Sequence, residues 1–277
     1  MDRETIGEEK VKIVRVQDGL RETLEDQLAA EEPLQIKVQY SSATGRVSRN
    51  ISVTMRTPGQ DRELAAGFLY TEGLIKSREV LDTIIQPAAD PDCVTVILKE
   101  NRELETPFLA RNFFTSSSCG VCGKTSVDTL FSISPYKNQP DSILLPDSFF
   151  YELPPLLKKQ QAVFKTTGGL HAAAIFGLDG KLIQLREDVG RHNALDKLIG
   201  AALLENRLPL SRSVLLLSGR SSFELLQKAV MAGIKIVASI GAPSGLAVDV
   251  AKSNDITLIG FLKNDRFNIY SGQKRIL

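Results

Sequence analysis

The sequence predicts an α/β protein with a smaller N-terminal α+β domain, residues 1–112, and a larger C-terminal domain, residues 113–277. From residue 190 onward, short apolar segments alternate with helical patterns, which is typical of a parallel sheet in a three-layer α/β/α arrangement. The first hundred residues are instead rich in segments that alternate polar and apolar side chains. A loop rich in serine and cysteine separates the two patterns.

The expected N-terminal elements follow from these patterns. Residues 1–30 are highly charged, so we expect a mobile arm that contains one strand. The small domain should then hold a β-hairpin with one wet face, a helix and a further strand. The expected elements are a strand at 11–16, a hairpin of 34–40 and 47–55, a helix at 61–70 and a strand at 93–98. The pattern at 77–85 fits either a helix or a strand.

The C-terminal part has a connector rich in proline, a hairpin signal and then regular alternation of helices and strands. The hairpin is expected around the turn residues Gly177–Gly180. The expected elements are a helix near 156–163, hairpin strands at 171–176 and 181–186, helices at about 191–205, 221–232 and 244–253, and strands at 214–217, 235–239 and 256–261.

Composition excludes several classes of partner. The formal net charge is +1, so no general attraction to nucleic acid or to an anionic membrane is expected. No apolar run reaches transmembrane length, and the charged N-terminus has no signal-peptide pattern. Three cysteines without a secretory signal indicate a reducing cytoplasm rather than a disulfide scaffold.

Two of the three cysteines form the pair Cys119 and Cys122, a C-x-x-C motif flanked by Gly120 and Gly123. Little side-chain bulk shields either sulfur. A short helix is expected after Gly123, and its N-terminus, together with Lys124, should lower the pKa of one of the two thiols. The pair is therefore suited to react with a substrate or to bind a ligand.

Three interpretations of this pair remain open. A structural zinc needs four ligands, and the further donors are only Cys93, His171 and His192. A thioredoxin-like redox pair expects a strand before the motif, but a serine-rich loop precedes it here. An exposed cysteine of low pKa could instead carry sulfur as a persulfide, with its neighbour close by to receive or regenerate it.

Polar, glycine-bearing segments follow the expected strands of the large domain. Ligands of open α/β sheets bind beyond the carboxyl ends of strands, and helix N-termini there favour anions. The cationic candidates at these ends are Arg191, Arg220, Lys263 and Arg266. These arginines could equally form surface pairs with Asp188 and Glu224, and Ser221 and Ser244 could simply be helix caps.

Further residues limit the chemical class of the expected ligand. No Walker A or G-x-G-x-x-G pattern is present, which disfavours ATP hydrolysis and NAD binding. Glu187 or Asp188 could accept a hydrogen bond from a purine amino group or a ribose hydroxyl. Each of His171 and His192 could be a general acid or base, or a structural residue. The sequence thus favours a nucleotide-like anionic ligand.

The motifs together resemble the FdhD family of formate dehydrogenase accessory sulfurtransferases, from about residue 30 to the C-terminus. They are Cys119-Gly120-Val121-Cys122-Gly123, Gly169-Leu170-His171-Ala172-Ala173-Ala174, the stretch from Glu187 to Lys197, and Ser218-Gly219-Arg220. The resemblance implies that Cys119 accepts sulfur from a cysteine desulfurase as a persulfide, with Cys122 as its partner. The sulfur then goes to the molybdenum or tungsten bis-guanine-dinucleotide pterin cofactor of formate dehydrogenase.

The resemblance also implies a cofactor site, whose residues are Phe261, Leu262, Lys263, Asn264, Asp265 and Arg266, joined by Arg191, His192, Ser218 and Arg220. The family tends toward Lys-Pro-Gly-Arg where this chain has Lys263-Asn264-Asp265-Arg266, so the two basic ends are the better candidates. The cofactor is a bound substrate that a guanine nucleotide could mimic, and no tightly bound metal is expected.

The family's large domain is similar in fold to cytidine deaminases. Deaminase chemistry is not expected here, because His171-Ala172-Ala173 lacks the glutamate of H-x-E and the C-x-x-C precedes the histidine. The resemblance further implies a homodimer. The alternative function is a non-catalytic chaperone that binds the cofactor or the dehydrogenase and holds a structural zinc at the C-x-x-C.

Overall fold

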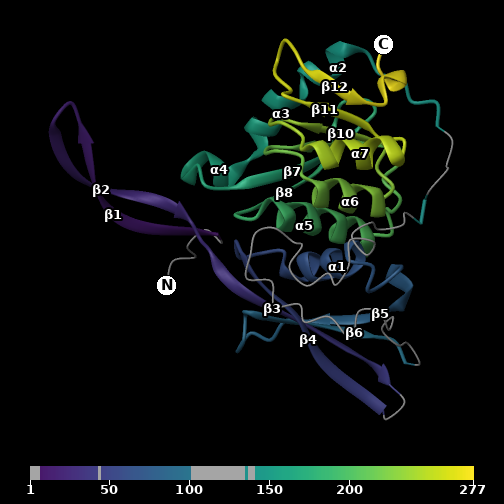
Figure 1. The fold of residues 1–277 in the computed structure, drawn as a ribbon. Coiled ribbons are helices and arrows are strands. Elements are labelled where there is room, and N and C mark those ends of the chain that lie inside the picture. The colour runs from purple at the N-terminus through teal and green to yellow at the C-terminus, as the bar shows by residue number, and fades with distance from the viewer. Residues whose placement is uncertain (1–6, 43–44, 101–134, 137–140) are drawn as a thin grey trace.

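The computed structural model describes residues 7–42, 45–100, 135–136 and 141–277 (Figure 1). Cys119, Cys122 and the expected domain boundary at 112/113 lie outside these residues. Within them, the strands form a two-stranded, a four-stranded and a six-stranded sheet. The mixed α/β class predicted from the sequence is confirmed, whereas the domain split and the likeness to cytidine deaminases stay predictions.

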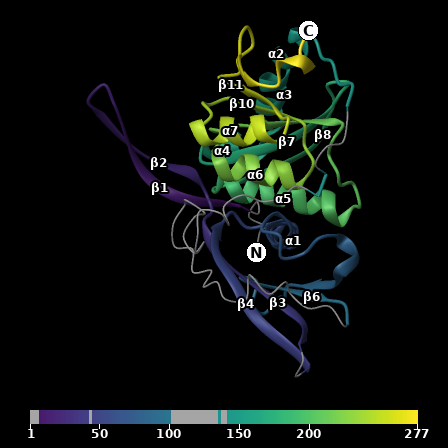
Figure 2. The ribbon, with the colours of Figure 1, turned by 45° about the vertical axis from the view of Figure 1, so that its right-hand side comes forward.

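The N-terminal arm is a hairpin of β1 (Glu8–Gln17) and β2 (Leu20–Ala29) that projects from the body in both views (Figures 1 and 2). Asp18 and Gly19 both adopt positive φ, at 51° and 81°, which is the geometry of a tight type I′ turn. The prediction of one strand was wrong, because the polar segment that forms β2 has no clear apolar alternation. Its strand conformation depends on pairing with β1.

The four-stranded sheet has the order β4-β3-β6-β5. The predicted hairpin is confirmed as β3 (Glu32–Ser42) and β4 (Gly45–Arg56), and alternate residues of β3 are buried. The predicted helix is α1 (Asp61–Thr71), which follows β4, and the predicted strand at 93–98 is β6 (Cys93–Leu98). The ambiguous segment contains a 3₁₀ turn and then β5 (Leu81–Ile85).

The six-stranded sheet has the order β12-β11-β10-β9-β7-β8. It is mixed rather than parallel, because only its middle strands follow the expected parallel pattern, and the predicted hairpin and an unpredicted edge strand add antiparallel pairs. The strands are β7 (His171–Gly177), β8 (Leu182–Asp188), β9 (Ser213–Leu217), β10 (Ile236–Ser239), β11 (Thr257–Gly260) and β12 (Asn268–Ser271).

Helices cover both faces of this sheet. One face packs on α5 (Arg191–Leu204), α6 (Phe223–Met231) and α7 (Gly245–Ser253), and the other on α2 (Asp147–Tyr151) and α3 (Leu153–Gln160). The helix expected near 156–163 is therefore two helices, since α3 ends at Gln160 and α4 (Ala162–Thr167) follows. None of the helices in the described part of the chain is long and apolar enough to cross a membrane.

Helices α1 and α5 touch backbone to backbone, and this contact joins the two larger sheets in one hydrophobic core. A Cβ on Gly67 would lie 1.9 Å from the carbonyl oxygen of Asp196. A Cβ on Gly200 would lie 1.9 Å from the carbonyl oxygen of Glu63. Only glycine fits at this crossing.

Candidate functional site

One edge of the six-stranded sheet gathers most of the predicted site residues. The ends of β9, β10 and β11 lie there because these strands are parallel. The pairs His171–Asp188 and Ala173–Leu217 bring the start of β7 and the end of β8 to the same edge. This carboxyl edge therefore carries Arg191, His192, Ser218 and Arg220 as well as the stretch 261–266.

The predicted residues fall into two groups on this edge. The helix half is Arg191 and His192, in the first turn of α5 after β8, and the turn half is Phe261–Arg266, after β11. Strands β7, β9 and β10 stand between β8 and β11. Four interstrand spacings of about 4.8 Å separate the ends of β8 and β11 by about 19 Å. Ser218 and Arg220, after β9, lie between them.

In the helix half, His192 is held by α6. Its Nε2 lies 3.3 Å from Oγ of Ser222 and 3.4 Å from Oε2 of Glu224, and the Ser222 hydroxyl donates to the same carboxylate at 3.1 Å. Burial alone would raise the pKa of Glu224, but the hydrogen bond and charge of His192 bring it below the usual value. Glu224 thus pairs with His192 rather than with an arginine.

His171 lies beside this group and is half-buried. Burial lowers its pKa, and the positive charges of Arg191 and His192 lower it further. A Cβ on Gly219 would come within 3.2 Å of Nδ1 of His171, so the glycine leaves space for the ring. His171 is therefore biased toward its neutral form, in which one ring nitrogen can accept a hydrogen bond.

Two buried donors on this edge have no hydrogen-bond partner among the described residues. They are Nε of Arg191 and Oγ of Ser221. Within the described ranges, no side chain caps the N-terminus of α5, whose N-cap residue is Gly190. Uncapped N–H groups beside an arginine favour an anionic ligand.

Ser218 has a structural bond that the sequence did not indicate. Its Oγ accepts from the backbone N–H of Ala172 at 2.8 Å, and its own N–H donates to the Ala172 carbonyl at 3.0 Å. Ser218 therefore ties β9 to β7. The hydrogen bonds from Gly241 N–H to the Gly219 carbonyl and from Phe261 N–H to the Gly241 carbonyl join the loops along the edge, both at 3.0 Å.

The turn half combines one core residue with exposed ones. Leu262 is buried among the residues that face α2 and α3, so its side chain cannot reach a ligand. Phe261 has a positive φ of 53° and is 45% exposed. The N–H of Lys263 donates to the Arg266 carbonyl at 2.9 Å, which closes a tight turn with exposed side chains from Lys263 to Arg266.

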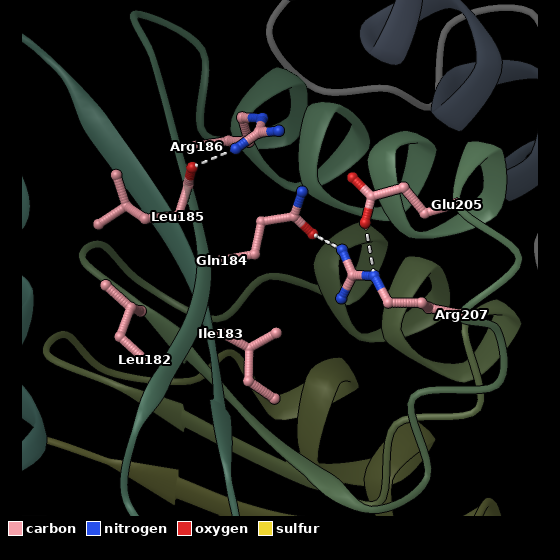
Figure 3. A pocket seen from close by; sticks show the side chains of 7 residues that line it. All are labelled: Leu182, Ile183, Gln184, Leu185, Arg186, Glu205 and Arg207. Atoms are coloured by element: carbon pink, nitrogen blue, oxygen red, sulfur yellow. Dashed lines mark hydrogen bonds and ion pairs between the residues drawn. The ribbon is translucent and has the colours of Figure 1, made fainter.

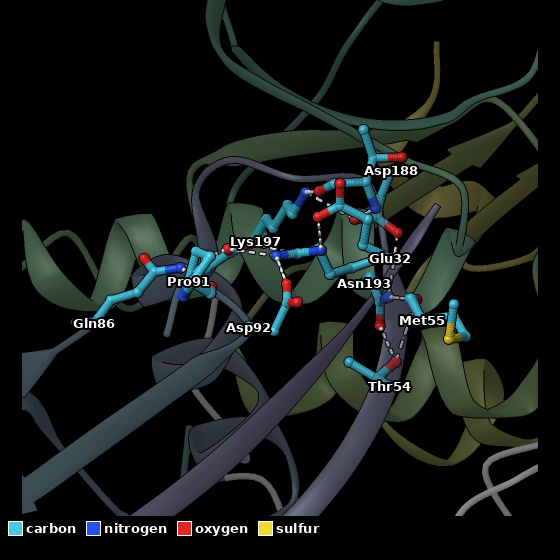
Figure 4. Close-up of polar contacts among 12 residues, drawn as sticks. Glu32, Thr54, Met55, Gln86, Pro91, Asp92, Asp188, Asn193 and Lys197 are labelled. Carbon is cyan, nitrogen blue, oxygen red and sulfur yellow. Dashed lines mark hydrogen bonds and ion pairs between the residues drawn. The ribbon is translucent and has the colours of Figure 1, made fainter. Parts of the chain in front are cut away.

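Asp188 is not a ligand residue, contrary to the prediction. It is fully buried, and Oδ2 accepts from Lys197 Nζ at 2.7 Å and from the Thr57 N–H at 3.2 Å (Figure 4). Oδ1 accepts from the Gly190 N–H at 2.8 Å and from Asn193 Nδ2 at 3.1 Å. Burial raises the pKa of Asp188, although Lys197 opposes that shift.

Glu187 is also occupied, since its carboxylate accepts from the N–H groups of Val163 and Phe164 and so caps α4. Lys197 was missed by the sequence reasoning. It is fully buried and donates to the Thr57 carbonyl at 2.8 Å, which ties α5 to the segment after β4. These residues build the wall behind the helix half instead of contacting a ligand.

A groove of about 500 Å³ runs along the outer edge of β8 (Figure 3). Its lining residues are Leu182, Ile183, Gln184, Leu185, Arg186, Glu205 and Arg207. The charged side chains are already paired, because Arg207 bonds Glu205 at 2.6 Å and Gln184 at 2.5 Å, and Arg186 bonds Glu63 at 2.9 Å. The groove lies toward the opposite end of β8 from Asp188 and is not part of the candidate site.

The fold and site define a mixed α/β protein whose sheet edge suits an anionic ligand. Among the described residues, no group of three or more histidine, cysteine or acidic side chains could hold a metal ion. The sequence model of the FdhD/NarQ family matches residues 29–277, and the chain belongs to this family. The resemblance seen in the sequence is thereby confirmed.

Curated relatives agree with this assignment. "Sulfur carrier protein FdhD" of Streptomyces coelicolor is 45% identical over 277 residues, with 97% of this chain and 95% of the relative covered. The protein of the same name from Picrophilus torridus is 42% identical, with 93% and 94% covered. The crystal structure of a proposed formate dehydrogenase accessory protein from Desulfotalea psychrophila matches with a TM-score of 0.76 and covers 98% of this chain and 100% of that one. At 24% identity, this match supports the fold alone.

Proposed function

We propose that this protein is a sulfur carrier in the maturation of formate dehydrogenase. It accepts sulfur from a cysteine desulfurase as a persulfide on Cys119 and delivers it to the molybdenum or tungsten bis-guanine-dinucleotide pterin cofactor, which it binds as a substrate. The observation that carries this proposal is family membership, with relatives named sulfur carriers, in a chain that has Cys119 and Cys122 as C-x-x-C. The cytoplasmic location expected from the cysteine content is part of it.

Two cysteines account for all atoms and electrons of the proposed sulfur transfer. The Cys119 thiolate attacks the outer sulfur of the desulfurase persulfide, and the desulfurase thiolate leaves. Cys122 then attacks the inner sulfur of the Cys119 persulfide, which forms a Cys119–Cys122 disulfide and releases hydrosulfide for the metal. The two electrons that reduce the transferred sulfur come from the cysteine pair, and a thiol reductant restores it.

The cofactor would dock on the carboxyl edge. Arg191, His192 and Arg220 would contact one part, and Lys263 and Arg266 another. Three features support this placement: the exposed turn, the start of α5 and Arg191 Nε, the last two of which have no side-chain cap and no hydrogen-bond partner in the part of the chain that the structure describes. Asn264 and Asp265 share the exposed turn, and Phe261 offers an exposed ring. Ser218 and Leu262 would contribute through the backbone they position.

Chain length permits Cys122 to reach this edge. Tyr136 is the nearest described residue with a packed position, where its hydroxyl lies 3.3 Å from that of Tyr70, and Tyr70 donates to the Met231 carbonyl at 2.9 Å. Met231 ends α6, at the opposite edge of the sheet. Fourteen residues separate Tyr136 from Cys122 (136 − 122). An extended chain of that length spans up to about 48 Å. This is longer than any strand of the six-stranded sheet, and so long enough to run from one edge of the sheet to the other.

Intact-mass measurement tests the carrier role. The protein is incubated with a cysteine desulfurase and cysteine, and wild type is compared with Cys119→Ala, Cys122→Ala and the control Cys93→Ala, whose thiol is buried in β6. Wild type and Cys93→Ala should gain one sulfur atom, and Cys119→Ala should gain none. No gain in wild type with an active desulfurase would refute the carrier role. Stoichiometric zinc that is lost in Cys122→Ala would support the chaperone alternative.

Calorimetry with GDP tests the cofactor site. Lys263→Ala combined with Arg266→Ala should weaken GDP binding at the turn half at least about 10-fold and leave binding at the helix half unchanged, because a hydrogen bond to a charged group contributes about 1.5–3 kcal/mol. The control Lys252→Ala removes an exposed lysine near the end of α7, at the opposite edge of the sheet, and should bind as wild type does. If both variants bound GDP equally well, the turn half would not be part of the cofactor site.

A further inference from the structure

Ser222 stands at the N-cap of α6 without acting as a cap. In the described part of the chain, its Oγ accepts no hydrogen bond from the backbone of that helix. Ser244 holds the same position before α7, and its Oγ accepts from the Ala247 N–H at 3.2 Å. Since a serine at this position normally stabilises the helix by such a bond, the Ser222 side chain is used for a different contact.

That contact is with Glu224 and His192. The Ser222 hydroxyl donates to Oε2 of Glu224 at 3.1 Å, so its oxygen is left to accept. Nε2 of His192 lies 3.3 Å from this oxygen and 3.4 Å from the same Oε2. Burial raises the pKa of Glu224, but the hydrogen bond and charge of His192 outweigh it and keep the carboxyl ionised. Both neighbours of Nε2 are therefore acceptors, and Nε2 carries a proton in the neutral as well as the charged ring.

This arrangement leaves Nδ1 of His192 as the ring nitrogen for a ligand, and the side chain is 20% exposed. In the protonated ring, Nδ1 donates to a phosphate oxygen while Nε2 stays on Glu224. The two buried donors without a partner among the described residues, Nε of Arg191 and Oγ of Ser221, belong to the chain neighbours of His192 and Ser222. These donors require acceptors, which the phosphate oxygens of an anionic ligand would supply.

We propose that Glu224 is a positioning residue that, together with Ser222, fixes the ring of His192 so that Nδ1 meets a phosphate group of the bound cofactor. This inference rests on the proposed function, which assigns His192 to the cofactor. Glu224 does not touch the ligand and acts only through His192. A carboxylate in the first turn of a helix also has an ordinary structural role, since it favours the helix dipole, so the test must separate the two roles.

A double-mutant cycle with GDP separates positioning from structure. Calorimetry is done on protein that carries Lys263→Ala and Arg266→Ala, so that binding reports the helix half. His192→Ala and Glu224→Ala should each weaken GDP binding on the order of 10-fold, because a hydrogen bond to a charged group is lost. The two changes combined should weaken it no more than one of them does, since Glu224 acts through His192.

Two further variants provide the rescue and the control. The amide oxygen of Glu224→Gln can still accept from Nε2, so this variant should keep most of the affinity. Glu205→Ala removes a carboxylate that pairs with Arg207 at the other end of α5, and it should bind GDP as the parent does. The chain has only two histidines, so NMR can follow the Nε2–H of His192 directly. This proton should exchange with water slowly in the parent and in Glu224→Gln, and fast in Glu224→Ala.

A pair of serine variants tests the same arrangement without removing a charge. Ser222→Ala should weaken GDP binding and leave the unfolding midpoint nearly unchanged, because no cap is lost. Ser244→Ala should do the reverse, because it removes the cap of α7. If Ser222→Ala lowered only the unfolding midpoint, Ser222 would have a structural role and the proposal would be wrong.

Other outcomes would also overturn the proposal. Losses in His192→Ala and Glu224→Ala that multiply to about 100-fold would show that the two residues act independently. So would a Glu224→Gln variant that is as weak as Glu224→Ala. If His192→Ala itself left GDP binding unchanged, the cofactor would not dock at His192, and this inference would fall with that part of the proposed function. The persulfide measurement on Cys119 reports on the carrier role separately.

Discussion

Gly200→Ala is expected to destabilise the protein by at least about 3 kcal/mol, at the upper end of the range for overpacked sites. The added Cβ would lie 1.9 Å from the Glu63 carbonyl oxygen and 2.7 Å from the backbone nitrogen of Gly67. No side chain can move aside there, because the obstacles are backbone atoms of α1. The helices would have to separate and leave gaps in the core between the two larger sheets. Urea unfolding measures the loss.

The matched control is Gly245→Ala, also in a helix. A Cβ on Gly245 meets no atom within 4 Å, and its φ is not positive. Alanine there should leave stability unchanged or raise it by about 0.4–1 kcal/mol, since it restricts the unfolded chain. Similar unfolding midpoints for the two variants would show that α1 and α5 do not meet as closely as the structure indicates.

Lys197→Met is expected to cost about 3–5 kcal/mol, because it leaves Asp188 buried without its cation. The side chains of both residues are fully buried, with 2.7 Å between Nζ and Oδ2. The loss should also depend on pH. Burial already raises the pKa of Asp188, and the shift must grow when Lys197 no longer opposes it.

The direction of this dependence follows from linkage. A carboxyl whose pKa is raised in the folded state favours folding below its unfolded pKa of about 3.9, and this contribution is lost as the pH rises toward the folded pKa. The deficit of Lys197→Met relative to wild type should therefore be larger at pH 8 than at pH 5. The double variant Asp188→Asn with Lys197→Met should recover part of the stability and lose the pH dependence. A deficit that is equal at both pH values would contradict this account.

The sequence predicted well those elements that have a regular pattern of apolar residues along their whole length. β3 alternates Leu34, Ile36 and Val38 toward the core, and α1 buries its apolar residues in the same core. β2 and β12 were missed because their residues are largely polar or exposed, so pairing with a neighbour rather than burial defines them. The sheet is mixed because the predicted hairpin of β7 and β8, as well as the missed strand β12, pairs antiparallel with its neighbours.

The site could be predicted only as far as topology determines it. Placing loops at the ends of parallel strands was enough to bring Arg220 and Lys263 to one edge. The sequence could not tell that Asp188 turns inward, since Lys197 lies nine residues later in a helix and their meeting depends on how α5 packs on β8. Ligand and wall residues share the same short motif, and only packing separates them.

The distance between the two halves of the carboxyl edge has a consequence for affinity. The two halves follow strands whose ends lie about 19 Å apart, so a small nucleotide would occupy one half at a time and bind each with its own modest strength. A ligand with two anionic ends joined by a linker of suitable length would bind the second half at a high effective concentration once the first is held. The fold would then select an elongated, two-ended ligand over its fragments through avidity, even if each end is recognised only weakly.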